Sequence, residues 1–330
     1  MEEYILPIDP HAVIRQFDRL ATKQAIQSLA SSFLTLEISK RMNERLDYIR
    51  LEPQYILDAG CGTGESLQSL STRYKNAHIL GIDASEKRLA LAQQRWPLKG
   101  WKSLWNKASK QASIQLQQAD ARDFPCPWPV DLLWSNCFLH WLPNPQEIIN
   151  HWASCLAPGG LLMLSCFGPD SFKQVREAAR TADLPGAVLP FLDMHDLGDL
   201  LVASQLITPV MDTEILTLTY ATPEALLNDL RLVGGNPHLQ RRQTLTGKAR
   251  WQKFIQALSD HRGKDGRISL TIEVIYGHAW RPLKPLARPD SQKISVDALA
   301  ASLPSRRKHN SLNKSKLEDA VVQHKPAQSF

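Results

Sequence analysis

The sequence predicts an α/β protein: a doubly wound, mostly parallel sheet with helical additions. Between residues 54 and 170, short apolar runs alternate with stretches of helical periodicity. That alternation is typical of parallel strands joined by crossover helices. The first run leads into a glycine-rich loop at 58–64, and later runs end on or near an aspartate. Parallel sheets bind ligands at the carboxyl ends of their strands, so the same observations indicate where a ligand site lies.

Local signals predict the individual elements. Apolar residues recur at helical spacing through 11–49, and Glu52-Pro53 ends that segment. Ser85 can cap a helix, Thr222-Pro223 begins another, and Pro158-Gly159-Gly160 predicts a turn. The seven expected strands are 55–58, 78–83, 114–120, 130–135, 161–166, 210–220 and 268–279. The expected helices beyond the first segment are 65–74, 86–95, 146–156, 170–181, 194–205, 224–233 and 247–260.

The net charge of +6 is concentrated at the carboxyl end of the sequence. Residues 281–330 contain ten Lys or Arg and four Asp or Glu, so the other 280 residues hold 29 of each sign. Apolar periodicity also stops there, and we expect a basic, disordered tail over 283–330. A surface for single-stranded nucleic acid would interleave aromatic residues with the charge, whereas this tail has one, Phe330. The composition therefore argues against nucleic-acid binding.

Other features exclude several classes of protein. The five cysteines are scattered and no pair has zinc-site spacing, so we expect buried reduced thiols and no metal site. The acidic start lacks the basic flank and apolar run of a signal peptide. No stretch approaches the roughly eighteen apolar residues of a membrane helix. We expect a cytoplasmic monomer without membrane contact.

The glycine loop narrows the kind of ligand. Gly60, Gly62 and Gly64 fall at every second position, whereas a dinucleotide fingerprint requires its third glycine at position 65, which is Glu65. An acidic residue at the start of the next helix would repel a phosphate. S-adenosylmethionine has no phosphate: its carboxylate can bind loop N–H groups, and its ammonium can bind Asp58 or a backbone carbonyl. Glycines allow the backbone to approach such a ligand closely.

Two further acidic residues stand at the ends of expected strands. Asp83 follows Gly64 by 19 residues, where a carboxylate can accept both ribose hydroxyls. Asp120, followed by Ala121, can accept from the adenine amino group. Each aspartate alone could equally be a cap, but three in register at one edge favour a cofactor site. The predicted cofactor residues are Asp58, Gly60, Gly62, Gly64, Asp83, Asp120, Ala121 and Asn136.

At this point the sequence resembles a known family. Residues 54–170 are similar to the class I S-adenosylmethionine-dependent methyltransferases, which implies a Rossmann-like fold with a seven-stranded sheet. Over 11–282 the chain resembles more narrowly the malonyl-[acyl-carrier protein] O-methyltransferases of biotin synthesis. That family usually carries a Tyr-Asp pair in its N-terminal helical segment, and residues 11–47 here contain no Tyr. The segments that carry the resemblance are 135–141, 191–196, 211–220, 229–231, 234–236 and 273–279.

The resemblance implies a reaction and a division of the chain. The cofactor would be S-adenosylmethionine, and the substrate malonyl-acyl-carrier protein or malonyl-coenzyme A, whose free carboxylate becomes a methyl ester. The expected parts are an N-terminal helical lid segment (1–53), a cofactor-binding core (54–170), the C-terminal part of the sheet with a helical substrate-lid insertion (171–282), and the tail (283–330).

The substrate side follows from the same resemblance. A carboxylate with a pKa of about 4 is already ionised at neutral pH, so we assign no general acid or base. An arginine suits the substrate carboxylate, and the candidates are Arg176 and Arg180, although a solvated helix face explains them equally well. Asn136, His140 and Trp141 follow the fourth strand, where substrates of this class dock. His140 could equally be a structural histidine.

Two alternatives stay open at this point. Mitochondrial complex I assembly proteins share the fold and parts of the C-terminal pattern, and some modify proteins or act as chaperone-like factors; formation of a methyl ester would discriminate. The insert 97–113 could dock an acidic carrier protein, or could extend a helix with tryptophans on the sheet and lysines in water. Its relevant residues are Trp101, Trp105, Lys99, Lys102, Lys107 and Lys110, next to Trp96.

Overall fold

The computed structural model describes residues 5–27, 33–96, 112–242 and 244–284. They belong to one compact unit that extends to Leu286. Residues 97–111 of the insert and residues 285–330 of the tail lie outside the described residues, so the predictions made for them are not tested.

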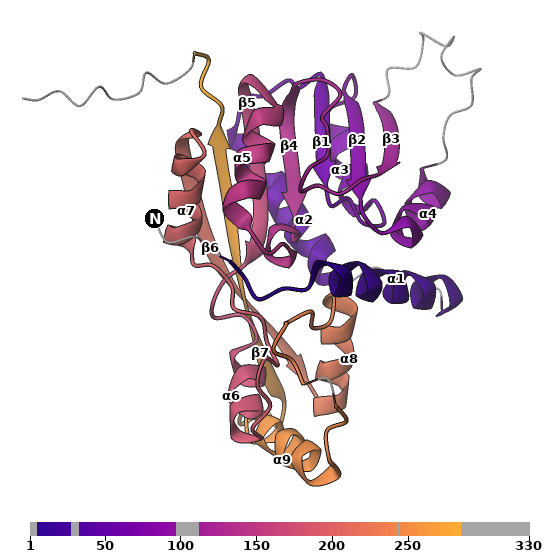
Figure 1. The fold of residues 1–330 in the computed structure, drawn as a ribbon, viewed down its shortest axis with the longest axis vertical. Helices are drawn as coiled ribbons and strands as arrows, with labels where there is room; N and C mark the ends of the chain where they lie inside the picture. The colour runs from indigo at the N-terminus through magenta and orange to yellow at the C-terminus, as the bar shows by residue number, and fades with distance from the viewer. Residues whose placement is uncertain (1–4, 28–32, 97–111, 243, 285–330) are drawn as a thin grey trace, which may run out of the picture. The chain divides into compact units, whose positions relative to one another are not determined.

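A seven-stranded sheet forms the centre of the fold, in the order β3-β2-β1-β4-β5-β7-β6 (Figure 1). Strands β1 to β5 run parallel, and β7 runs antiparallel to both β5 and β6. The predicted doubly wound, mostly parallel sheet is therefore confirmed. The strands are β1 (Tyr55–Ala59), β2 (His78–Asp83), β3 (Ser113–Gln118), β4 (Val130–Asn136), β5 (Leu156–Phe167), β6 (Ile207–Tyr220) and β7 (Ile268–Trp280).

Helices cover both faces of this sheet. Along β1 and β4 successive residues alternate between two buried clusters: Ile56 packs with α2 and α3, and Leu57 packs with α5 and α7. This alternation follows from the two-residue period of a strand, and burial on both faces explains why these strands are continuously apolar. The helices are α1 (Pro10–Gln27), α2 (Phe33–Arg45), α3 (Glu65–Arg73), α4 (Glu86–Arg95), α5 (Pro145–Cys155), α6 (Lys173–Thr181), α7 (Met194–Ala203), α8 (Pro223–Val233) and α9 (Lys248–Ser259), with short 3₁₀ turns at Leu46–Tyr48 and Leu139–Trp141.

One local prediction was wrong. Pro158–Gly160 was expected to be a turn before a strand at 161, but β5 begins at Leu156 and includes these residues. Gly159 has φ +77°. Its N–H donates to the carbonyl of Arg281, and the N–H of Arg281 donates to the carbonyl of Gly160 at 2.8 Å. Pairing with the residue after β7 therefore holds the glycines in the sheet, a long-range contact that local turn signals do not report.

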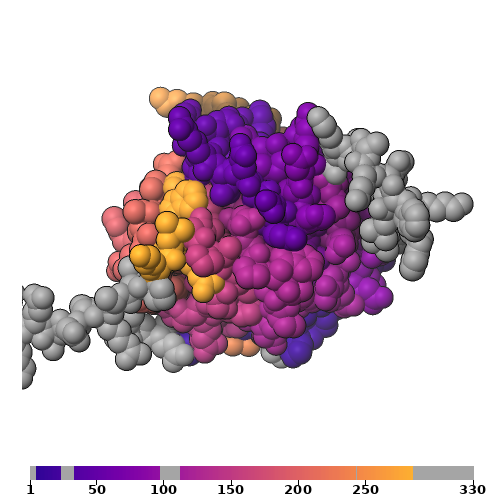
Figure 2. Space-filling view, turned by 90° about the horizontal axis from the view of Figure 1, so that it is seen from above, coloured from indigo at the N-terminus to yellow at the C-terminus, as the bar shows by residue number. Residues whose placement is uncertain are grey.

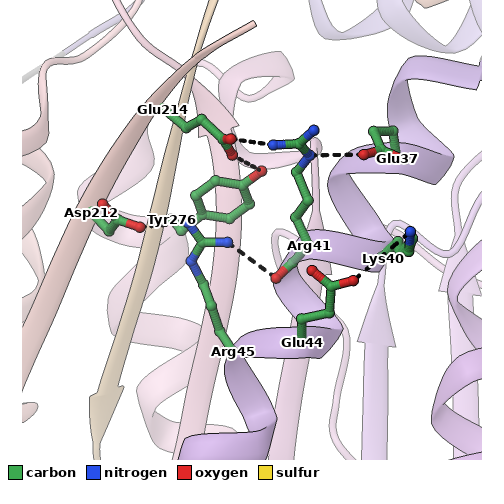
Figure 3. A network of polar contacts seen from close by, with 8 residues as sticks. All are labelled: Glu37, Lys40, Arg41, Glu44, Arg45, Asp212, Glu214 and Tyr276. Atoms are coloured by element: carbon green, nitrogen blue, oxygen red, sulfur yellow. Dashed lines mark hydrogen bonds and ion pairs between the residues drawn. The ribbon is translucent and has the colours of Figure 1, made fainter.

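Helix α2 is fixed to the antiparallel strands by a charged network (Figure 3). Arg41 forms an ion pair with Glu214 of β6, and Arg45 forms one with Asp212. The Arg45 guanidinium also lies 3.7 Å from the ring centroid of Tyr276 on β7. Since the apolar face of α2 is buried as well, both charged and apolar contacts hold this helix against the sheet.

Three further properties bear on the class of protein. None of the described helices is long and apolar enough to cross a membrane. Within the described ranges no group of three or more His, Cys, Asp and Glu is placed to hold a metal ion. All five cysteines are free thiols, and four of them are buried.

Candidate functional site

The glycine loop connects β1 to α3 at the carboxyl edge of the parallel strands. Gly60, Gly62 and Gly64 have φ values of +79°, +60° and +81°, a region that L side chains adopt at a cost of about 1–2 kcal/mol. The N–H groups of Gly60 and Cys61 both donate to the carbonyl of Ile82, at 2.9 Å. The loop is thereby fixed against the end of β2, where Asp83 stands.

Asp83 is held by the backbone of the loop it faces. Its carboxylate accepts from the Gly62 N–H at 2.9 Å and from the Ser85 N–H at 2.8 Å, and the residue is 6% exposed. Burial raises the pKa of Asp83, and the guanidinium of Arg88, 3.7 Å away, opposes that rise. The carboxylate is therefore placed at the strand end with a fixed orientation, as the sequence predicted.

Asp58 lies deeper in the same edge. It is 1% exposed, and its Oδ2 atom accepts no hydrogen bond from any described residue. Burial raises its pKa well above the usual value, and the neighbouring Glu65 and Asp83 add to the rise. A buried oxygen without a donor is costly, so a ligand that brings an ammonium to this edge would be stabilised. Asp58 therefore fits the ammonium group of S-adenosylmethionine.

Asp120 and Ala121 stand two and three residues after the end of β3. Asp120 is bound by the guanidinium of Arg122, with Nε at 2.9 Å and Nη2 at 2.6 Å from its Oδ2. Burial raises the pKa of Asp120, but the bonds from Arg122 outweigh burial and leave it below its usual value. Ala121 is buried and its carbonyl accepts from the Trp152 indole at 2.9 Å. Asp120 lines the same cleft as Asp83.

Side chains of the protein lie directly over the loop. The two adjacent clefts there measure about 50 and 40 Å³, and both are lined by Phe17 of α1, Arg88, Phe138 and Trp141. The Arg88 guanidinium lies 4.5 Å from the Phe17 ring centroid, and a Cβ on Gly62 would be 2.2 Å from its Nη2. Ligand sites usually measure about 300–1,000 Å³. Both clefts are therefore smaller than a usual ligand site, and the side chains of Phe17, Arg88 and Phe138 bound them.

Asn136 connects the site to the N-terminal segment. Its Nδ2 donates to the carbonyl of Thr35 at 3.0 Å, and its Oδ1 accepts from the Ser165 hydroxyl at 2.9 Å. The residue ends β4 and lines the cleft beside Gly60. Both ends of the amide are therefore satisfied by protein groups, and the side chain has one orientation.

His140 is buried in an aromatic cluster. Its Nδ1 accepts from the Phe167 N–H at 3.3 Å, which places the proton of the neutral ring on Nε2. Nε2 has no hydrogen-bond partner among the described residues. The ring stacks on that of Phe167, with 4.4 Å between the ring centroids. It is tilted against the Trp141 ring and edge-on to the Phe191 ring. Burial lowers the pKa of His140 to about 3, so it is uncharged at neutral pH.

A larger cavity of about 390 Å³ lies on the other side of Trp141. Residues of α6, α8 and α9 line it, together with the chain at 184–191. These three helices lie below the parallel strands in Figure 1. Its lining is mostly apolar, and among the described lining residues Arg231 is the one charged side chain. Trp141 lines this cavity and both cofactor clefts, and thus separates two neighbouring spaces.

The predicted arginines stand elsewhere. Arg176 and Arg180 are on α6, but neither lines the cavity or the cofactor clefts. Arg176 is half-buried and donates to the carbonyl of Ser171 at 3.1 Å, and Arg180 is exposed. The structure thus brings together Asp58, the glycines, Asp83, Asp120, Asn136 and Trp141, and leaves these two arginines apart.

Sequence reasoning missed three residues of the site. Arg88 stands three residues after the Ser85 cap, and a base one turn into the helix after Asp83 was a usable signal. Arg231 belongs to a segment that carried the family resemblance, but nothing in the sequence pointed it toward a cavity. Phe17 gave no signal, because its contact with Trp141, 5.4 Å between ring centroids, joins segments far apart in the chain.

Comparison with known proteins agrees with this geometry. A family model described as a methyltransferase domain matches residues 56–160. The crystal structure of the YcgJ protein from Bacillus subtilis is similar with a TM-score of 0.51 at 16% sequence identity, covering 74% of this chain and 98% of that one. With the strand order and the glycine loop, these findings define a class I S-adenosylmethionine-dependent methyltransferase, and S-adenosylmethionine is its cofactor.

Curated relatives narrow the family. The malonyl-[acyl-carrier protein] O-methyltransferase of Methylovorus sp. is 35% identical over 86% of this chain and 93% of its own length. The protein with the same name from Nitrosospira multiformis is 37% identical over 83% of this chain and 90% of its own length. The chain belongs to the malonyl-[acyl-carrier protein] O-methyltransferase family.

Proposed function

We propose that this enzyme methylates the free carboxylate of a malonyl thioester carried by an acyl-carrier protein or by coenzyme A. One observation carries the proposal: the cavity beside the cofactor clefts shares Trp141 with them, and Arg231 is the one charged residue among its described lining residues. A small anionic acyl group in that cavity would have its carboxylate paired with a guanidinium. The names of the curated relatives support the same substrate.

The residues of the site suit a reaction that needs no base. When bound, S-adenosylmethionine supplies an electrophilic methyl group on a sulfonium. A carboxylate is ionised at neutral pH, so one of its oxygens can form the new C–O bond while the methyl–sulfur bond breaks. His140, whose pKa is lowered to about 3, stays neutral and offers an N–H rather than a base. The protein then contributes orientation and exclusion of water.

We assign the cofactor contacts to the carboxyl edge of the sheet. Asp83 would accept the ribose hydroxyls, Asp58 would receive the ammonium, and Gly60, Gly62 and Gly64 would let the cofactor approach the backbone of the loop closely. Asp120 with Ala121 stays our prediction for the adenine end. Supporting this assignment, Gly60, Asp83 and Asp120 line the two clefts that Phe17 also lines.

On the substrate side, we propose Arg231 in addition to the residues predicted from the sequence. Asn136, His140 and Trp141 remain candidates there, and Arg176 and Arg180 remain the alternative carboxylate ligands. The division into a lid segment (1–53), core (54–170), lid-bearing part (171–282) and tail (283–330) also remains a proposal. A monomeric state, a cytoplasmic location and a role in biotin synthesis are proposals as well.

The experiment is direct. Purified protein is incubated with S-adenosylmethionine and malonyl-acyl-carrier protein, and both products are followed by mass spectrometry. We expect the acyl group to gain 14 Da, the difference between a methyl and a hydrogen, with one equivalent of S-adenosylhomocysteine. Succinyl- and acetyl-carrier protein serve as controls for chain length and for the free carboxylate. Consumption of S-adenosylmethionine without a malonyl methyl ester would contradict the proposed substrate.

A further inference from the structure

The segment from Leu230 to Ser259 has an unusual charge. It contains six Lys or Arg and no Asp or Glu. Because residues 1–280 hold 29 of each sign, the remainder of that body holds 23 basic and 29 acidic residues, a balance of −6. A neutral body thus carries a locally cationic segment, which comprises the end of α8, the connection to α9, and α9 itself.

Most of these cations are exposed, and most form no ion pair with a residue that the structure describes. Arg242 donates to the Thr244 hydroxyl at 2.9 Å, and Arg241 donates to the backbone carbonyl of Asn236. Lys248 is exposed at the start of α9. Of the six cations, Arg250 alone forms an ion pair with a described carboxylate, that of Asp183. Uncompensated cations on one surface attract an anionic partner over about a Debye length.

The same segment exposes apolar side chains. Leu239 is 58% exposed and Leu245 is 97% exposed. Trp251, on the first turn of α9, is 39% exposed and also lines the cavity. A leucine that is almost fully exposed contributes little to the fold, and apolar residues among cations are typical of surfaces that bind another protein.

The segment also forms the wall of the substrate cavity. Leu230, Arg231 and Val233 of α8 and Trp251 and Phe254 of α9 line it. Residues that face the cavity and residues that face solvent therefore alternate along one piece of chain. Because Trp251 is partly exposed and also lines the cavity, a partner bound on the outside of this wall would stand beside a residue that reaches from solvent to the cavity.

From this geometry we infer that Leu239, Arg241, Arg242, Leu245, Lys248 and Lys253 form a docking surface for an acidic carrier protein. We call these six residues the basic lid surface. The carrier would bind its acidic face to the cations, its apolar residues to the leucines, and pass its thioester arm into the cavity past Trp251. The inference rests on the proposed function, because it identifies where the carrier of that same substrate binds. It is independent of the insert 97–113.

Charge reversal provides the test. The double variant Arg242→Glu/Lys248→Glu leaves the cavity lining unchanged, and a glutamate at the first position of α9 suits the helix dipole. We expect kcat/KM for malonyl-acyl-carrier protein to fall at least tenfold at low ionic strength, with the loss shrinking as salt is added. Turnover of a small malonyl thioester without a carrier protein, the N-acetylcysteamine thioester, should stay within twofold of the unchanged enzyme.

A matched control separates this effect from net charge. Arg50→Glu/Lys75→Glu changes the charge by the same amount at two exposed positions just before β1 and β2, at the opposite edge of the sheet. This control should keep the carrier-protein rate within twofold. Leu245→Ser should raise KM for the carrier protein severalfold without changing the melting temperature, because the side chain is exposed.

Two results would overturn the docking surface. Equal losses for both double variants would mean that overall charge acts, not this surface. An equal loss on malonyl-coenzyme A and on the carrier protein would mean that the cations bind the phosphates of coenzyme A. Absence of turnover on the small thioester in the unchanged enzyme is a separate result, since it contradicts the proposed function rather than the surface.

Discussion

The cofactor clefts and the larger cavity, which lie on the two sides of Trp141, are formed by different kinds of chemical group. On the cofactor side, the groups that matter are the glycine loop and the carboxylates Asp58 and Asp83, and hydrogen bonds join the loop to Asp83 and to the end of β2. On the cavity side, the groups are mostly apolar side chains from three helices and a connecting segment. Register between adjacent parallel strands fixes the first arrangement, whereas helix packing fixes the second. The first side is therefore rigid, and the second can change its lining without altering the sheet.

This difference predicts opposite responses to mutation. On the cofactor side, replacing a single group should affect cofactor binding strongly and the substrate hardly at all. On the cavity side, replacements should change the substrate constants and leave the cofactor constants alone. The predictions below test that separation, from the largest expected effect to the smallest.

The largest effect is expected at Asp83. Asp83→Asn removes the charge that orients the Gly62 N–H and would accept ribose hydroxyls, so S-adenosylmethionine should bind about 1–3 kcal/mol more weakly, roughly 5- to 150-fold. Calorimetry measures this directly. The control is Asp131→Asn, because that carboxylate also accepts two backbone N–H groups, those of Gln54 and Tyr55. Wild-type cofactor affinity for Asp83→Asn would remove it from the site.

Much of the cofactor side could be predicted from the sequence for a physical reason. Asp58, Asp83 and the three glycines occupy fixed offsets from strand ends, and the sheet converts those offsets into proximity. The backbone groups that bind these residues could not be predicted in the same way. The edge of the sheet where the residues lie could be predicted. Arg88 and Phe17 were missed because they reach the loop across α4 and α1, and such contacts depend on packing.

The cavity side shows the limit of that reasoning. The offset of Arg176 from the fifth strand suggested the substrate edge, yet α6 begins three residues later than expected, at Lys173, and packs beside the lower half of β7. Arg231 reaches the cavity because α8 follows β6, one of two long antiparallel strands that extend beyond the parallel ones (Figure 1). Helix positions on such an extension have no counterpart in local sequence spacing.

A second prediction concerns His140, which lies at the boundary between the two sides. Burial lowers its pKa in the folded protein to about 3 from an ordinary value of 6.5. Because the folded pKa is depressed, its contribution to stability is present above pH 6.5 and is lost as the pH falls toward 3. Between pH 7 and pH 5 this loss amounts to about 2 kcal/mol.

The measurement compares how steeply the free energy of unfolding changes with pH in each variant, rather than its absolute value. His140→Gln keeps an acceptor for the Phe167 N–H but does not titrate, so its free energy of unfolding should fall less between pH 7 and pH 5 than that of the unchanged protein. His195→Gln, at an exposed position on α7, should keep the original slope. Parallel curves for the unchanged protein and His140→Gln would show that His140 takes up its proton with an ordinary pKa.

A third prediction compares arginines on the cavity side. Arg231→Gln removes the charge on the cavity wall. We expect kcat/KM for a malonyl thioester to fall about tenfold, mostly through a higher KM. A tenfold fall corresponds to about 1.4 kcal/mol of lost transition-state stabilisation. The affinity for S-adenosylmethionine should not change. Arg176→Gln and Arg180→Gln, on α6, should each cost less than twofold. The reverse order would return the carboxylate site to α6 and contradict the assignment of Arg231.

The smallest effect is expected at the carboxyl end, where two truncations should differ. Arg281 is tied to the sheet: its backbone pairs with Gly159 and Gly160, and its guanidinium donates to the carbonyls of Ser154 and Leu156. Figure 2 shows the end of β7 against residues of the α5–β5 region on this face.

A chain that ends after Lys284 keeps these bonds, so its melting temperature should match that of the full chain within about 2 °C, and its turnover should be the same. A chain that ends after Trp280 loses them together with the contact of Leu283 with Gly159, and should melt several degrees lower. Since this face lies opposite the site, kcat and both KM values should stay unchanged in each. Destabilisation by the first truncation would show that residues beyond 284 contribute to the fold and that the sequence-based expectation of a disordered tail is wrong.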